Sequence, residues 1–210
     1  KGVFKEFNTY DFEIIIKKFT EAHRLFKKYK PDNKIAEELL LEANNIKGKL
    51  VHSISEKHPH SQTEISENRI FNTLIFLSNF DNIFSLNYDL LLYWVLMNKN
   101  DLKQKYPLIK NVYNINDGFH GSTSLTWGYN KEKQNVFYLH GALHLVEGYI
   151  NVVKIKNNEI DNLISIIQSN LERNCFPLIV AEGSMVEKLR KIKHNEYLNY
   201  CYDKLSCIEG

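Results

Sequence analysis

The chain has 210 residues, of which 43% are hydrophobic and 25% are charged. Twelve Tyr, twelve Phe and only four Pro argue against a disordered chain, because aromatic side chains supply the burial that offsets chain entropy. The formal net charge is +2, and the lysines are scattered along the chain rather than massed in one block. Nucleic-acid binding is therefore not indicated.

The three cysteines, Cys175, Cys201 and Cys207, are an odd number without a Cys-x-x-Cys spacing. They predict reduced thiols rather than a disulfide framework or a zinc site, so no metal is expected. The N-terminal sequence has no apolar stretch typical of a secretion signal, and no apolar run approaches the roughly 20 residues of a membrane helix. We therefore expect a cytoplasmic protein with no membrane partner.

Apolar residues recur at steps of three or four through most of the first 80 residues, which is typical of amphipathic helices. This spacing predicts helices over residues 10–30, 33–58 and 64–79. Residues 1–80 are thus expected to form a helical layer or cap.

From residue 81 onward, short apolar runs alternate with longer helical patterns. The sequence predicts strands over 82–87 and 176–182, and over 135–155 a strand followed by a hairpin that turns near Glu147 and Gly148. It predicts helices over 89–98, 159–173 and 183–209, and an irregular segment over 99–134. Buried strands separated by helices indicate a parallel sheet with helices on its faces. We expect residues 81–210 to form this α/β core, continuous with the cap in one domain.

Three polar residues, Asn87, Tyr88 and Asp89, lie between the strand 82–87 and the helix that follows it. In open parallel sheets, ligands bind beyond the carboxyl ends of the strands. A helix N-terminus there offers unpaired N–H groups to phosphate or ribose oxygens. The simpler alternative is that Asn87 or Asp89 only caps the helix, an interaction of about 1 kcal/mol.

A second polar feature is His140–Gly141, which ends the apolar run of the next predicted strand. Histidine titrates near neutral pH and can move a proton from a sugar hydroxyl or water. Gly141 would let backbone or ligand approach closely. His140 could instead be a satisfied core histidine. His144 is four residues away, but on a strand and turn the two would not form a metal pair.

Other polar and aromatic residues have simpler expected roles. Asp117 and His120 lie in the irregular segment, where they could close over a substrate or belong to a plain turn. Ser184 is expected to cap the helix that it precedes. Trp94 and Trp127 are expected in the core.

Taken together, FSLNYD (84–89) and YLHG (138–141) resemble the Thr-Gln-Asn-Ile-Asp and His-Gly motifs of sirtuin-like NAD-consuming domains, in a bacterial version where Tyr often replaces Ile. The segments DGF (117–119) with Trp127, and FPLIVAEGS (176–184), further resemble an uncharacterised bacterial branch of this family. Its relatives act in anti-phage defence. The resemblance extends from about residue 9 to residue 210.

The resemblance implies a Rossmann-like sheet with flanking helices and an activity, cleavage of the nicotinamide–ribose bond of NAD. It implies catalytic roles for Asn87 and His140. Residues expected to bind the NAD substrate are Ser85, Tyr88, Asp89, Asp117, Gly141 and Glu182. The expected protein is an NAD glycohydrolase that releases nicotinamide and ADP-ribose, with a homo-oligomer or a phage-derived trigger as further partners.

The chain departs from that family at both ends. The Gly-rich turn that wraps the pyrophosphate and the later Gly-x-Ser-Leu motif are absent, so we expect a fragment without the first and last strands. The four cysteines of a sirtuin zinc ribbon are also absent, which favours NAD hydrolysis over protein deacetylation. Two alternatives stay open: a non-catalytic module that senses NAD or ADP-ribose or contacts a protein, and a structural domain in which Asn87 and Asp89 are only caps.

Overall fold

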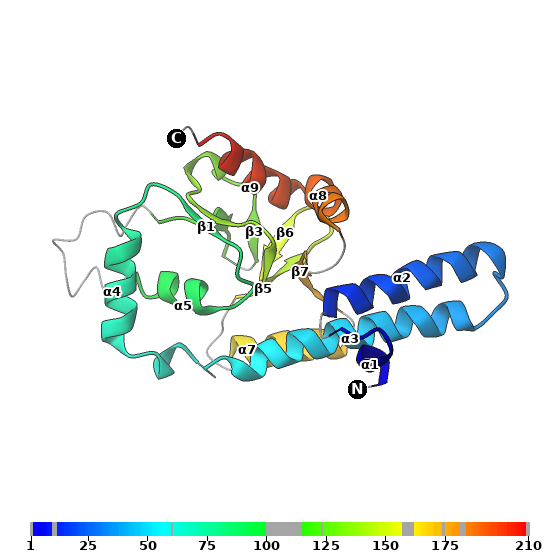
Figure 1. Ribbon diagram of the computed structural model, residues 1–210. Coiled ribbons are helices and arrows are strands. Elements are labelled where there is room, and N and C mark those ends of the chain that lie inside the picture. Colours follow the sequence, from blue (N-terminus) through cyan, green and yellow to red (C-terminus); the bar gives the residue numbers. More distant parts are fainter. Residues whose placement is uncertain are drawn as a thin grey trace. The chain divides into compact units, whose positions relative to one another are not determined.

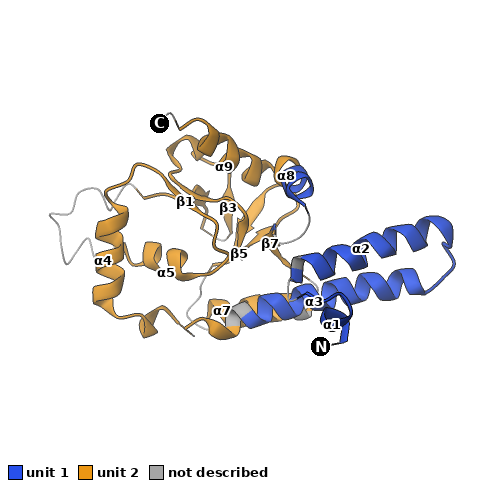
Figure 2. Cartoon of the chain, viewed as in Figure 1, with its two compact units in different colours: residues 1–55, 180–191 blue, residues 56–179, 192–210 orange. Residues whose placement is uncertain are grey.

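The computed structural model describes residues 2–9, 12–59, 61–99, 115–122, 124–156, 162–173, 175–180 and 184–208. The chain divides into two compact units, each described here by itself (Figure 2). Unit 1 comprises Lys1–Ser55 and Val180–Lys191, and unit 2 comprises Glu56–Ile179 and Ile192–Gly210. The elements are helices and strands together, which confirms the prediction of a mixed α/β chain (Figure 1).

Unit 1 is helical. It contains α1 (Gly2–Glu6), α2 (Phe12–Tyr29), most of α3 (Ile35–Lys57) and the first part of α8 (Met185–His194). The apolar stripes of α2 and α3 meet in a small core of Ile15, Ile16, Ala43 and Ile46. The predicted helices over 10–30 and 33–58 are therefore confirmed within the described residues. The short α1 was not predicted.

Ser184 and Glu187 interact at the start of α8. The Ser184 backbone N–H and hydroxyl both donate to Glu187 Oε2, at 2.8 and 2.7 Å. Lys17 of α2 contacts the same oxygen at 2.9 Å. The hydrogen bonds from Ser184 and Lys17 lower the pKa of Glu187 to about 2. Ser184 directly precedes the helix, as predicted, and its carbonyl accepts a 2.9 Å hydrogen bond from Lys188 N.

Over its described residues, unit 2 contains helices and two sheets. The helices are the 3₁₀ turns η1 (Gln62–Glu64) and η3 (Lys131–Lys133), and the α-helices α4 (Glu67–Leu77), α5 (Leu91–Met97), α7 (Leu163–Glu172) and α9 (Glu196–Ser206). The smaller sheet pairs β1 (Ile83–Ser85) with β4 (Val136–Tyr138) in parallel. The larger sheet has the order β2 (Phe119–His120), β3 (Leu125–Trp127), β6 (Val152–Lys154), β5 (Gly141–Glu147), β7 (Pro177–Ile179).

The pairing within the larger sheet corrects the prediction of one parallel sheet. All of its strand pairs are antiparallel. The reason lies in the connections: only residues 148–151 separate β5 from β6, whereas a parallel pair needs a crossover of about a dozen residues or more. The hairpin predicted at Glu147–Gly148 is thereby confirmed. Strands β2 and β3 also occupy part of the segment predicted to be irregular.

The core of unit 2 contains several large aromatic side chains beside aliphatic ones. Its fully buried side chains include Trp94, Trp127, Phe137, Tyr138 and Tyr197, so the two tryptophans are core residues as predicted. Helix α9 packs on β4, and α7 packs on β5. Over the residues that the structure describes, no helix has the length and apolar character needed to cross a membrane.

Candidate functional site

The parallel pair β1–β4 brings the two predicted motifs together. Its register pairs Ser85 with Tyr138, so the chain leaves both strands at the same edge. The contact continues past the strands, because Leu139 N donates to Ser85 O at 2.9 Å and Leu143 N donates to Tyr88 O at 2.8 Å. We call Asn87, Tyr88, Asp89 and His140 the strand-end cluster.

His140 is half-buried and lies beside two tyrosine rings. Its Nε2 lies 3.1 Å from the hydroxyl of Tyr202 on α9. Its ring is within 26° of parallel to the Tyr88 ring, with centroids 6.5 Å apart. The histidine and the tyrosine of the two motifs are therefore neighbours in space. The prediction that His140 lies beside the turn at 87–89 is confirmed.

Asn87 is the exposed member of the cluster. Its backbone N–H donates to the Ser85 hydroxyl at 3.2 Å, so Ser85 shapes the turn. Among the residues that the structure describes, the Asn87 carboxamide has no hydrogen-bond partner, and it has two donors and an acceptor to offer to a ligand. The structure leaves this side chain at the surface of the strand end.

Asp89 has a structural contact. Its Oδ1 accepts a hydrogen bond of 3.0 Å from Leu91 N, the first residue of α5. This contact supports the alternative that Asp89 stabilises the start of the helix. The N-cap residue itself is Leu90, whose side chain makes no cap bond. Burial lowers the pKa of the nearby His58, and the Asp89 charge partly opposes that shift. The carboxylate is half-buried and keeps a second oxygen for a further partner.

Gly141 is required by the sheet. Its φ is +78°, and a Cβ at this position would collide with the backbone oxygen of Leu178 on the neighbouring strand β7. The close approach that the sequence indicated is therefore made by protein backbone. A side chain here would strain the backbone and push β7 away.

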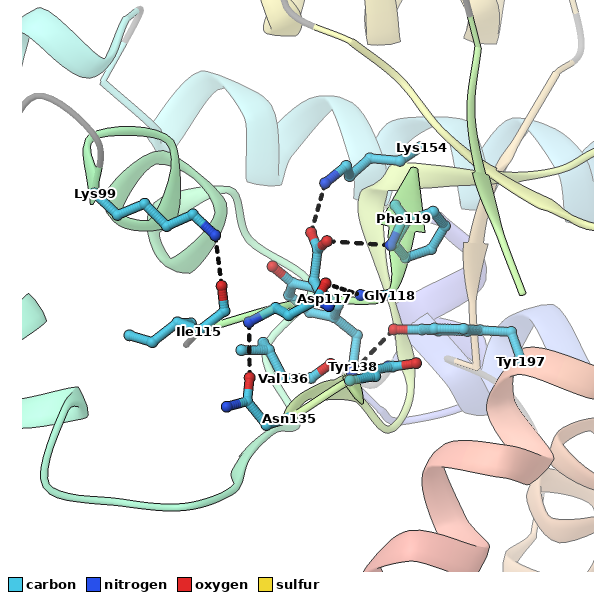
Figure 3. A network of polar contacts seen from close by, with 12 residues as sticks. Lys99, Ile115, Asp117, Gly118, Phe119, Asn135, Val136, Tyr138, Lys154 and Tyr197 are labelled. Atoms are coloured by element: carbon cyan, nitrogen blue, oxygen red, sulfur yellow. Dashed lines mark hydrogen bonds and ion pairs between the residues drawn. The ribbon is translucent and has the colours of Figure 1, made fainter. Parts of the chain in front are cut away.

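Asp117 lies in a buried ion pair rather than at an open loop surface (Figure 3). Lys154 Nζ is 2.6 Å from Asp117 Oδ2, and the two residues are 8% and 9% exposed. The other carboxylate oxygen accepts a 3.3 Å hydrogen bond from Phe119 N. This geometry holds Asp117 in the interior, with both oxygens engaged by the protein. Its half-buried neighbour in the same segment, His120, ends β2.

Sequence reasoning missed the polar groups beside this pair. His144 is fully buried on β5, stacked on Tyr93 at 4.5 Å and edge-on to Tyr138 at 5.0 Å. Within the described part of the chain, neither ring nitrogen of His144 has a hydrogen-bond partner. The Tyr138 hydroxyl has none either. Burial, followed by the Lys154 charge, lowers the pKa of His144 well below its usual value. Burial likewise raises the pKa of Tyr138. A polar His in the apolar run GALHLVE was the available signal.

We call Asp117, Lys154, Tyr138 and His144 the buried network. Lys154 also lies 5.3 Å from the ring centroids of both Tyr93 and Phe119, so its charge is enclosed by aromatic faces. Close by, Lys99 donates to the Ile115 carbonyl, and burial lowers the pKa of Lys99. The members of the network come from β4, β5, β6 and the residues directly before β2.

The remaining predicted site residue, Glu182, lies outside the described residues. Among the residues that are described, no group of three or more His, Cys, Asp or Glu side chains is arranged to hold a metal ion. Cys175 and Cys207 are exposed thiols, and Cys201 is buried, where desolvation raises its pKa to about 12. Cys201 is thus a filler of the core, as its small apolar character allows.

Comparison with known proteins gives a family without an assigned activity. No curated protein and no solved structure matches the chain at a significant level. Residues 1–208 match a family described as "Domain of unknown function (DUF4917)". Because this match spans nearly the whole chain, the chain belongs to the DUF4917 family.

Proposed function

We propose that the protein is a sirtuin-like domain that hydrolyses the nicotinamide–ribose bond of NAD. The observation that carries the proposal is the parallel register of β1 and β4, since Ser85 opposite Tyr138 brings the segments of Asn87 and His140 to one sheet edge. Ligand binding beyond the carboxyl ends of parallel strands is the general rule for such sheets. In this proposal β1 and β4 belong to a Rossmann-like core.

Hydrolysis of the nicotinamide–ribose bond needs only a few protein groups. Water adds to the ribose carbon as the bond to nicotinamide breaks, nicotinamide leaves as a neutral base, and one proton is released. The chain must orient the sugar, hold the water and accept that proton. The exposed carboxamide of Asn87 can hold a hydroxyl or water, and the imidazole of His140 can accept the proton.

Asp89, Tyr88 and Ser85 support binding in this proposal. Asp89 has one oxygen on Leu91 N, and its charge suits a ribose hydroxyl or the nicotinamide amide. The Tyr88 ring, 6.5 Å from that of His140, offers a flat face beside the proposed reaction centre. Gly141 acts indirectly, by allowing β7 to approach β5. Asp117 acts from the interior through its pair with Lys154.

The biological setting follows from the resemblance alone. A domain that depletes NAD in the cytoplasm when triggered by a phage product would serve as an anti-phage effector, acting as a homo-oligomer or through its trigger. A non-catalytic sensor of NAD or ADP-ribose is the alternative.

The test is nicotinamide release from NAD, followed by chromatography, with binding measured in parallel by calorimetry. We compare the full-length protein with Asn87→Ala and His140→Ala, and use Asn72→Ala and His194→Ala as controls because both residues are exposed and lie on other elements. Release that is lost only in the first two variants, with their folds intact, supports hydrolysis. Binding without release identifies a sensor, and neither binding nor release refutes both functions.

A further inference from the structure

Tyr202 reaches the proposed catalytic histidine from the far end of the chain. Its hydroxyl lies 3.1 Å from His140 Nε2, and the two rings are within 10° of parallel with centroids 6.3 Å apart. In sequence the residues are 62 positions apart. The resemblance that pointed to His140 gave no role to this tyrosine.

Helix α9 holds Tyr202 firmly in unit 2. The helix begins at the Asn195 cap, whose Oδ1 accepts from Leu198 N at 3.1 Å. It buries Tyr197, Leu198 and Cys201. The Tyr197 hydroxyl accepts a 3.2 Å hydrogen bond from Tyr138 N on β4, two residues before His140 (Figure 3). The strand that ends at the histidine and the helix that carries Tyr202 are thus joined directly.

The ring of His140 contacts two tyrosine rings, from Tyr88 after β1 and from Tyr202 on α9. Tyr88 is itself fixed, because its carbonyl accepts from Leu143 N at 2.8 Å. Such near-parallel aromatic contacts restrict how the imidazole can turn. The aromatic contacts alone do not decide which ring nitrogen carries the proton, since they involve the ring faces.

The hydrogen bond with the Tyr202 hydroxyl determines which ring nitrogen of His140 carries the proton. A neutral imidazole has one N–H and one acceptor nitrogen, and the hydrogen bond made by one nitrogen determines the form of the other. We propose that Tyr202 is a positioning residue for His140: its hydroxyl oxygen accepts a hydrogen bond from Nε2–H, which fixes the ring orientation and the tautomer in which Nδ1 is the nitrogen that takes up a proton. The use of this arrangement in catalysis rests on the NAD hydrolysis proposed above.

The variant that isolates the hydroxyl is Tyr202→Phe, which keeps the ring. The matched control is Tyr200→Phe, because Tyr200 lies on the same helix and its hydroxyl also makes one hydrogen bond, of 2.6 Å, to the Lys131 carbonyl. We expect kcat for nicotinamide release to fall by roughly 10- to 100-fold in Tyr202→Phe, a typical cost of a misplaced catalytic group. KM should be unchanged, because ground-state binding is kept. The control should behave as the wild type.

A measurement independent of turnover is the ¹⁵N NMR spectrum of the His140 ring in the full-length protein. We expect the tautomer populations of His140 and its titration midpoint to change in Tyr202→Phe and to stay unchanged in Tyr200→Phe. Identical His140 spectra in all three proteins overturn the positioning role. If the wild type releases no nicotinamide, the proposed function fails, while the spectra still decide whether Tyr202 positions His140.

Discussion

Two regions of unit 2 gather polar side chains, and they differ in what surrounds them. In the strand-end cluster, Asn87 is exposed and His140 is half-buried between aromatic rings. In the buried network, Asp117 and Lys154 are paired in the interior and His144 is enclosed by Tyr93 and Tyr138. Accessible polar groups can meet a ligand, whereas a desolvated ion pair stays within the fold and a buried polar group without a hydrogen-bond partner lowers stability. We therefore expect substitutions in the first region to change the proposed activity and substitutions in the second to change stability.

The largest effect should come from the strand-end cluster and should appear in activity alone. In His140→Ala we expect nicotinamide release to fall by about 10²–10⁴-fold, the typical contribution of a general base. The thermal unfolding midpoint should stay close to that of the wild type, because the side chain is half-buried. Rate assays and circular dichroism melts of the same sample check both. A His140→Ala variant that keeps the wild-type rate of nicotinamide release, or that unfolds, would contradict an effect of His140 on activity alone.

The next effect should come from the buried network and should appear in stability. Lys154→Met leaves the Asp117 carboxylate buried without its 2.6 Å partner. We expect a loss of about 3–5 kcal/mol in the free energy of unfolding, measured by urea titration.

The matched control is the double variant Lys154→Met with Asp117→Leu, which removes both charges. It should be clearly more stable than the single variant, because no uncompensated charge remains. A double variant as unstable as the single one would show that packing, and not the ion pair, sets the cost.

A smaller effect should appear as a pH dependence of stability. Burial lowers the pKa of His144 in the folded state below its unfolded value, so below a pH of about 6.5 the unfolded chain binds more protons. The contribution of His144 to the free energy of unfolding should therefore be constant above a pH of about 6.5. Below that pH the contribution should fall, by up to about 1.4 kcal/mol per pH unit. His144→Phe should flatten the dependence between about pH 6.5 and pH 5, and the exposed His194→Phe should not. An unaltered slope in His144→Phe would be inconsistent with a neutral buried imidazole.

The smallest stability effect should come from Asp89, which belongs to the cluster but also supports the start of α5. Asp89→Ala removes the acceptor of Leu91 N, and we expect a loss of about 1 kcal/mol in urea unfolding. Asp89→Asn keeps an acceptor oxygen and should retain most of that stability while nicotinamide release falls. If Asp89→Asn is fully active, Asp89 is a structural residue only.

Several features of the site could be predicted from local sequence. Short apolar runs marked β1 and β4, and the polar residues directly after them marked the strand ends. A hydrophobic period shows roughly where an element begins and ends. The association of Asn87 and Tyr88 with His140 came from the resemblance to the sirtuin-like motif pair, together with the expectation that ligands bind beyond the carboxyl ends of parallel strands.

Long-range pairing could not be predicted in the same way. Asp117 and Lys154 are 37 residues apart, and His140 and Tyr202 are 62 apart. A lysine in a strand usually faces solvent, so the interior position of Lys154 depends on the register of β6 against β3 and β5. The antiparallel order of the larger sheet was missed because the sequence shows which segments are strands but not which partners they choose.

The most direct test of the central claim is a stoichiometric assay of purified full-length protein with NAD. The account predicts that nicotinamide and ADP-ribose appear in equal amounts in the wild type and in His194→Ala, and that both are lost in Asn87→Ala and His140→Ala that remain folded. Equal product formation by all four folded proteins, or by none of them, would contradict a catalytic strand-end cluster.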